Sequence, residues 1–147
     1  MRLYLDVCCL GRLDDDPGQA RISLEADAIE LIFQRIAANQ WEWISSEAID
    51  IEIGHNPNPE RRSRARMLVA DCHHKVAVGV AEAERAAQLV TLGFGAMDGV
   101  HLACAESGGA QVFLTTDDRL LRLARRLRSA LKVRVENPIT WLRQVIP

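Results

Sequence analysis

Four acidic residues stand where a carboxylate could take part in chemistry. Asp6 directly follows a short apolar run, and Asp117 follows another apolar run after two threonines. Each of these aspartates alone is explained by a strand end or a helix cap. Glu52 and Asp98 lie among apolar neighbours in helix-like segments, where an unpaired carboxylate would be costly. Four inward carboxylates would repel one another, and the oxygen-preferring cations Mg²⁺ or Mn²⁺ relieve that repulsion.

The segments that carry these acids alternate between strand-like and helix-like patterns. Strands are predicted at 2–7, 41–45, 111–115 and 133–135, and 75–80 fits either a short strand or an extended connection. Helices are predicted at 23–39, 46–54, 60–74, 82–92, 96–107, 118–131 and 139–145, with a charged loop at 11–18. Neither an internal repeat nor a second domain is visible, so residues 1–147 are predicted to form one domain.

The order of these elements predicts an α/β fold. Each connection between strands is long enough for a crossover, so we expect a mainly parallel sheet flanked by helices on both faces. Ligands bind such sheets beyond the carboxyl ends of the strands. Asp6 and Asp117 are both predicted at that edge.

Composition limits the class of protein. The chain is 48% hydrophobic and 26% charged, which is typical of a globular protein. It has no apolar stretch near the ~20 residues of a membrane helix and no cleavable apolar leader, so we expect a cytoplasmic protein without membrane contact. Structural zinc is disfavoured, because the four cysteines contain no CxxC pair and the four histidines have no repeated ligand spacing.

Basic residues gather in two segments although the net charge is only −2. One segment holds Arg61, Arg62, Arg64 and Arg66, and the other runs from Arg119 to Arg134 without an acid. The second begins beside the candidate acidic site, which suits a polyanion substrate, with Arg119 and Arg122 contacting phosphates. The alternative is an ordinary solvated helix face.

Four segments, in this order and spacing, resemble the acidic motifs of the PIN domain family, which includes VapC-like metal-dependent ribonucleases. They are LYLDVCCLGRLDD, ISSEAIDIEI, GAMDGVHLACAESGG and VFLTTDDRLL, and the resemblance covers nearly the whole chain. It implies a three-layer PIN-like fold with a parallel sheet of four or five strands. It further implies Mg²⁺ or Mn²⁺ in an acidic pocket, and single-stranded RNA as substrate.

The resemblance also assigns roles to residues. It makes Asp6, Glu52, Asp98 and Asp117 catalytic and metal-binding, with Asp6 and Asp98 bound to the metal most directly. Thr115 or Thr116 would hold a metal-bound water and contact substrate. Glu47 competes with Glu52, and Asp118 competes with Asp117. Cys8 stands near the position where the family usually has a small hydroxyl residue. His101 is interpreted as a packed histidine, hydrogen-bonded to the backbone, rather than a ligand.

The predicted function is therefore metal-dependent endonucleolytic hydrolysis of single-stranded RNA, and many such proteins are the toxins of toxin–antitoxin pairs. The implied partners are RNA, an antitoxin protein and a second copy of the chain, with Trp41 or Trp43 as a candidate dimer surface. The alternative is a catalytically silent PIN-like module that binds RNA or protein. A receiver domain would need a lysine after the late strand, and a haloacid-dehalogenase-like phosphatase would need an aspartate where Cys8 stands.

Overall fold

Five strands and eight α-helices make up the chain in its computed structural model, which describes all 147 residues. The strands are β1 (Arg2–Leu5), β2 (Glu42–Ser46), β3 (His74–Val76), β4 (Val112–Leu114) and β5 (Arg134–Glu136). The α-helices are α1 (Val7–Arg12), α2 (Ala20–Ala37), α3 (Glu47–Gly54), α4 (Pro59–Val69), α5 (Val80–Thr91), α6 (Ala96–Ser107), α7 (Asp118–Arg126) and α8 (Pro138–Val145), and a 3₁₀ turn spans Arg128–Ala130.

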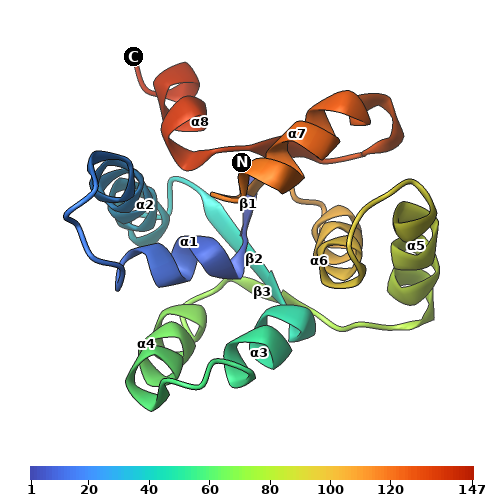
Figure 1. The fold of residues 1–147 in the computed structure, drawn as a ribbon, viewed down its shortest axis with the longest axis horizontal. Coiled ribbons are helices and arrows are strands. Elements are labelled where there is room, and N and C mark those ends of the chain that lie inside the picture. The colour runs from blue at the N-terminus through green and yellow to red at the C-terminus, as the bar shows by residue number, and fades with distance from the viewer.

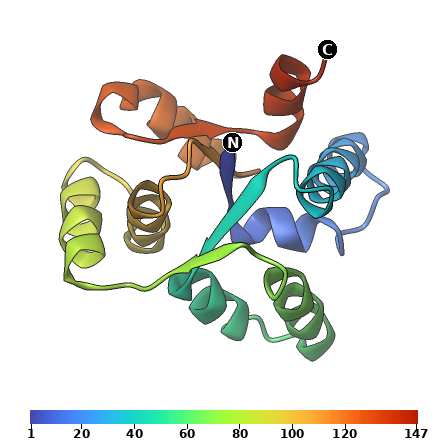
Figure 2. The same cartoon turned by 180° about the vertical axis from the view of Figure 1, so that it is seen from behind.

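The strands form one sheet in the order β3-β2-β1-β4-β5, and every neighbouring pair is parallel. From β1 the chain adds β2 and then β3 on one side, and it later adds β4 and β5 on the other. This reversal places helices on both faces of the sheet, as Figures 1 and 2 show for α1, α2 and α4 on one face and α5 and α6 on the other. The predicted parallel α/β sandwich is thus confirmed, with five strands.

The two central strands are buried on both faces. All three residues of β4 are buried, and so are Leu3, Tyr4 and Leu5 of β1. The rings of Tyr4 and Phe113 stack with their centroids 5.2 Å apart, because β1 and β4 pair in a register that sets the two residues side by side. Continuous apolar runs are typical of parallel strands covered by helices. The residues after β1 and β4 therefore emerge at one edge of a rigid core.

Helix α1 is the largest departure from the predicted elements. A strand was predicted through Val7 and a loop from Gly11, whereas β1 ends at Leu5 and α1 starts at Val7. The helix begins there because the Asp6 carboxylate accepts a hydrogen bond from the Val7 amide at 2.9 Å. A candidate catalytic residue is thus also the cap of the first helix.

Smaller differences concern element ends. The helix predicted at 60–74 ends at Val69, since the chain turns so that the His73 amide can donate to the Trp43 carbonyl at 2.9 Å. The helix predicted at 118–131 ends at Arg126, and a 3₁₀ turn follows. The ambiguous segment at 75–80 supplies the short edge strand β3.

Both tryptophans that were considered as a dimer surface pack inside the molecule. Trp43 is buried and meets Phe33 edge-on, with the ring centroids 5.0 Å apart. Trp41 is half-buried and lies 4.8 Å from Trp141 between ring centroids. Their contacts are those of core residues. None of the helices has the length and apolar content that crossing a membrane requires.

Substitution of Gly108, the residue that follows the last residue of α6, tests the packing of this helix on the sheet. A Cβ at this position would lie 2.6 Å from Ile44 Cγ2 and 2.8 Å from Val76 Cγ2. Gly108→Ala should therefore lower the free energy of unfolding by about 1–3 kcal/mol, as overpacking does. Gly11→Ala is the matched control, because a Cβ there meets nothing within 4 Å and alanine favours the helix. Equal urea midpoints for the two variants would contradict this packing.

Candidate active site

Asp6 lies where β1 ends, at the edge of the sheet. Its amide donates to the Leu114 carbonyl at 2.9 Å, so the turn after β1 is tied to β4. Its side chain is 6% exposed and accepts a hydrogen bond from the Thr115 hydroxyl at 2.9 Å. The Cys8 thiol lies 3.5 Å from the same carboxylate oxygen. Sulfur therefore makes the polar contact with Asp6 near the position where the family usually has a small hydroxyl residue.

The pKa of Asp6 is raised above its usual value. Burial is the main cause, because it disfavours the charged form, and the negative charge of Glu52 adds to the effect. His101 and the hydrogen bond from Thr115 act in the opposite direction. No lysine or arginine of the chain pairs with Asp6.

Asp117 comes to the same edge from β4. Its amide donates to the Thr115 hydroxyl at 3.1 Å, so one threonine holds both Asp6 and the start of α7. One oxygen of the Asp117 carboxylate caps α7 by accepting from the Arg119 and Leu120 amides at 2.9 and 3.2 Å. The side chain is exposed and remains open to solvent at the site.

Glu52 projects from the last turn of α3 toward the fully buried His101 of α6. Its Oε1 lies 3.5 Å from His101 Nε2. The other ring nitrogen of His101 lies 2.8 Å from the Tyr4 hydroxyl, which is itself 2.7 Å from the Ser46 hydroxyl. Ser46 also caps α3 by accepting from the Ile49 amide at 3.3 Å. A chain of side-chain contacts thus joins β1, β2, α3 and α6 behind the acids.

Asp98 lies in the first turn of α6 and is half-buried. Its pKa is raised to about 6, first by burial and then by the negative charges of Asp6, Asp117 and Glu52. The structure therefore brings all four predicted acids near one another. Asp6, Glu52 and His101 form the tightest group, with one ligand atom from each lying within 4.8 Å of the others. The donor set suits a divalent cation, and the orphaned Nε2 atom of His101 faces it.

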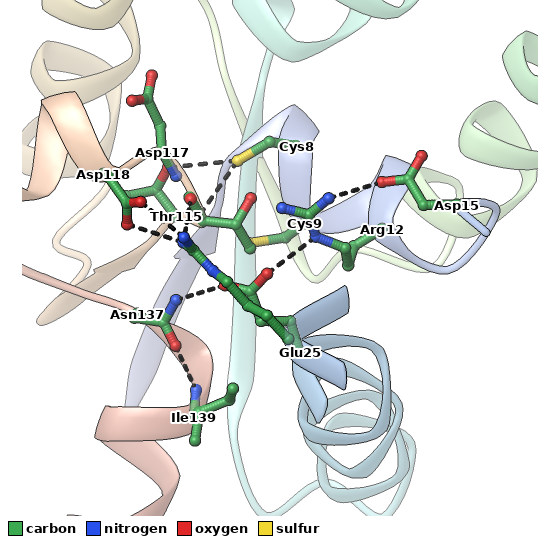
Figure 3. Close-up of polar contacts among 12 residues, drawn as sticks. Cys8, Cys9, Arg12, Asp15, Glu25, Thr115, Asp117, Asp118, Asn137 and Ile139 are labelled. Carbon is green, nitrogen blue, oxygen red and sulfur yellow. Dashed lines mark hydrogen bonds and ion pairs between the residues drawn. The ribbon is translucent and has the colours of Figure 1, made fainter. Parts of the chain in front are cut away.

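The two residues that compete for the acidic positions are occupied elsewhere. Glu47 accepts a hydrogen bond from the Val78 amide at 3.0 Å, on the connection between β3 and α5. Asp118 is held by the Arg21 guanidinium through two hydrogen bonds of 2.6 and 2.7 Å, which lower its pKa. Figure 3 shows that Asp117 and Asp118 point in different directions, although they are adjacent in the chain. The geometry favours Glu52 and Asp117.

A second polar cluster, drawn in Figure 3, lies behind the site and centres on the fully buried Glu25 of α2. Its carboxylate lies 3.0 Å from Arg12 Nε and accepts from Asn137 Nδ2 at 2.7 Å. Arg21 approaches it at 3.4 Å and donates to the Thr116 carbonyl at 3.1 Å. Buried charges of this kind need partners, and Glu25 has them on three elements. The cluster ties α1, α2 and α8 to the turn that carries Asp117.

The basic side chains near the site are free. Arg119 and Arg122 of α7 are exposed, and neither forms an ion pair. Arg122 lines a groove of about 440 Å³ between α2, α7 and α8, together with Arg125 and Arg143. Thr116 is buried, and its amide donates to Cys8 Sγ at 3.3 Å.

Comparison with known proteins identifies the family. The family model described as "PIN domain" matches residues 15–126, which is most of the chain, so the chain belongs to the PIN domain family. No curated protein sequence matches it significantly. Among solved structures, a chain of VapBC2 from Rickettsia felis, bound to a DNA fragment from its promoter, has a TM-score of 0.62 at 14% identity, covering 93% of this chain and 98% of the other. A chain of FitAB bound to an IR36 DNA fragment has a TM-score of 0.59 at 16% identity, covering 93% and 95%. At these identities the likeness establishes a shared fold.

Sequence reasoning missed several residues that shape the site. Tyr4 stands two residues before Asp6, and residues i and i+2 of a strand share a face. His101 stands three residues after Asp98, and residues i and i+3 share a helix face. Both spacings were visible in the sequence. His101 was interpreted as hydrogen-bonded to the backbone, which is wrong, because its ring contacts the Tyr4 side chain. No spacing in the sequence pointed to the role of Glu25.

The raised pKa of Asp98 makes the stability of the metal-free protein depend on pH. A carboxyl whose pKa rises from 3.8 to about 6 on folding contributes stability below about pH 4 that is lost as the pH rises through 6. Asp98→Asn removes this loss. At pH 7 in chelator, the free energy of unfolding of this variant should therefore exceed that of the wild type by about 1–2 kcal/mol, a value that allows for solvent screening of a half-buried group. At pH 4 the two proteins should be much closer. Denaturant titrations across pH 4–7, with exposed Asp27→Asn as control, measure this difference, and a gap that stays constant with pH would refute the assignment.

Proposed function

We propose that this protein is a metal-dependent endoribonuclease that hydrolyses phosphodiester bonds of single-stranded RNA. The observation that carries the proposal is the uncompensated charge at the carboxyl edge of β1 and β4. Asp6, Glu52, Asp98 and Asp117 converge there, yet no lysine or arginine pairs with any of them. The chain does pair Glu25 with Arg12, and Asp118 with Arg21. An acidic pocket left without protein cations favours Mg²⁺ or Mn²⁺ as its counter-charge.

The residues of the chain have distinct tasks in this proposal. Asp6 and Asp98 are proposed as direct ligands of the cation. Glu52, which groups with Asp6 in the structure, and Asp117 complete the site or orient the attacking water. Thr115 fixes the Asp6 carboxylate and the start of α7 through its hydroxyl. Divalent cations bound there would activate water and offset the charge that develops on the leaving oxygen.

Single-stranded RNA is proposed as substrate because exposed arginines follow the acidic edge. Arg119 and Arg122 have no acidic partners, so both are available to phosphates. A metal site with free guanidinium groups beside it suits a polyanionic substrate, because the arginines can bind its backbone phosphates while the bond is cut at the metal. Membership of the PIN domain family agrees with a nuclease.

We further propose that the protein is the toxin of a toxin–antitoxin pair. Its fold is shared with chains of VapBC2 and FitAB over nearly its full length. An antitoxin would be a second protein that blocks the acidic edge. Co-expression with the product of the adjacent gene, followed by co-purification and loss of cleavage, supports this role, whereas unchanged cleavage in the presence of that product argues against it.

Cleavage of a mixed-sequence single-stranded RNA tests the enzymatic proposal. Purified protein should cut it with Mn²⁺ or Mg²⁺ and not with chelator, and Asp6→Asn should lower the rate by about a hundredfold or more, because the site loses a charge without losing volume. Asp27→Asn, which changes an exposed aspartate of α2, should cut like the wild type. Metal binding without cleavage of any RNA would favour the catalytically silent binding module.

The adjacent pair Asp117 and Asp118 gives a sharper test of the site. Asp117→Asn keeps the cap of α7, since asparagine caps as well as aspartate, but removes charge from the acidic pocket. Its cleavage rate should fall at least about tenfold further than that of Asp118→Asn, which loses its pairing with Arg21. Initial rates at saturating Mn²⁺, with both melting temperatures recorded, compare the variants. The reverse order would assign the site to Asp118.

A further inference from the structure

His101 is fully buried, yet one of its ring nitrogens has no hydrogen-bond partner. Nε2 is buried without a partner, and its nearest carboxylate is Glu52 Oε1 at 3.5 Å. An unsatisfied buried polar atom destabilises the folded state, so most proteins avoid it. This atom faces the acidic pocket, and it needs a partner that the chain does not supply.

The opposite nitrogen is firmly held. Nδ1 lies 2.8 Å from the Tyr4 hydroxyl, and that hydroxyl lies 2.7 Å from Ser46 Oγ. Both contacts are buried, and Ser46 is fixed as the cap of α3. Histidines that bind metals usually donate their other ring N–H to such a partner, which fixes the ring and selects the tautomer.

The proton is best placed on Nδ1. In that tautomer Nδ1 donates to Tyr4, Tyr4 donates to Ser46, and Ser46 also accepts from the Ile49 amide. The N–H of Nδ1 and the O–H of Tyr4 then each have an acceptor, and Nε2 presents a lone pair. The other tautomer would leave a buried N–H without a good acceptor. A lone pair beside carboxylates is repelled by them unless a cation lies between.

The three donors have the spacing of ligands around one ion. One ligand atom each from Asp6, Glu52 and His101 lies within 4.8 Å of the others. Ligands bound to one ion at ~2.1–2.2 Å lie about 3–4.4 Å apart, which is close to this spread. Asp98 lies near enough to the group for the charges of Asp6 and Glu52 to raise its pKa, and Asp117 adds a further negative charge there.

We propose that His101 Nε2 is a nitrogen ligand of the cation site, beside Asp6 and Glu52, and that the site therefore selects a first-row transition dication over Mg²⁺. The inference deepens the proposed function and rests on it for the cation site. Imidazole suits transition metals, whereas Mg²⁺ prefers oxygen ligands and retains water. An all-carboxylate site would discriminate between them far less.

Mn²⁺ tests this proposal, because its unpaired electrons report directly on nitrogen ligands. The wild-type protein, freed of metal with chelator and loaded with one equivalent of Mn²⁺, should show ¹⁴N coupling in pulsed electron paramagnetic resonance. Calorimetry on the same protein should show that Mn²⁺ binds more tightly than Mg²⁺. Neither readout requires RNA or catalytic turnover.

Two matched histidine variants complete the experiment. His101→Gln should lose the ¹⁴N coupling and about 10- to 100-fold of its Mn²⁺ affinity, with a much smaller change for Mg²⁺. His55→Gln is the control, because His55 is exposed at the end of α3, and it should behave like the wild type. The wild-type spectrum decides the question even if His101→Gln fails to fold.

The outcomes separate this proposal from the proposed function. Bound Mn²⁺ without ¹⁴N coupling, or coupling that persists in His101→Gln, overturns the nitrogen ligand, and RNA cleavage by the same sample would leave the nuclease standing. Coupling that disappears in His101→Gln supports the assignment of His101 as a metal ligand, even if no RNA is cut. Failure of the wild type to bind Mn²⁺ overturns the proposal.

Discussion

Repulsion among like charges at one edge of the sheet is the constraint on which the structure depends. Four carboxylates converge there. The pKa values of Asp6 and Asp98 are raised first by burial and then by the negative charges of neighbouring carboxylates. The helices that begin at this edge partly offset the cost of this burial. Asp6 and Asp117 cap α1 and α7, so each carboxylate accepts backbone N–H bonds at the positive end of a helix. The remaining charge is what a bound cation would neutralise.

The Glu25 cluster shows how the same chain treats a carboxylate that serves the fold. Glu25 is as deeply buried as Asp6, but Arg12, Arg21 and Asn137 surround it. Through Arg21 the cluster also fixes the Thr116 carbonyl and Asp118. The chain therefore holds two buried carboxylates, Glu25 with protein cations beside it and Asp6 without. This contrast distinguishes a carboxylate of the candidate active site from one that stabilises the fold. Only the three-dimensional structure reveals it.

Much of the arrangement was predictable from the sequence because it follows from local pattern. The apolar runs before Asp6 and after Gln111 predicted strands, and the crossover lengths predicted a parallel sheet with helices on both faces. Parallel strands then bring Asp6 and Asp117 to one edge without further information. Helix α1 was missed because Val7–Arg12 carries a glycine and two cysteines, which weaken a helical pattern, and its start depends on the Asp6 cap.

The parts that could not be predicted depend on partners distant in sequence. Asp118 differs from Asp117 through Arg21, which lies 97 residues away, and Glu47 differs from Glu52 through the Val78 amide. The role proposed for His101 depends on Tyr4, which is likewise 97 residues away, and on the lack of a hydrogen-bond partner at Nε2, which no sequence pattern indicates. The family resemblance already favoured Asp117 and Glu52, but the contacts that hold Asp118 and Glu47 elsewhere could be seen only in the tertiary structure.

Anomalous diffraction from crystals of the protein soaked in Mn²⁺ tests the central claim most directly, namely that the convergent carboxylates form a cation site. The account predicts a strong anomalous peak at the carboxyl edge of β1 and β4, within bonding distance of Asp6 and of at least one other of the four acids. An Mn²⁺-soaked crystal with no peak there, or with Asp6 and Asp98 paired instead to lysine or arginine side chains, would contradict it.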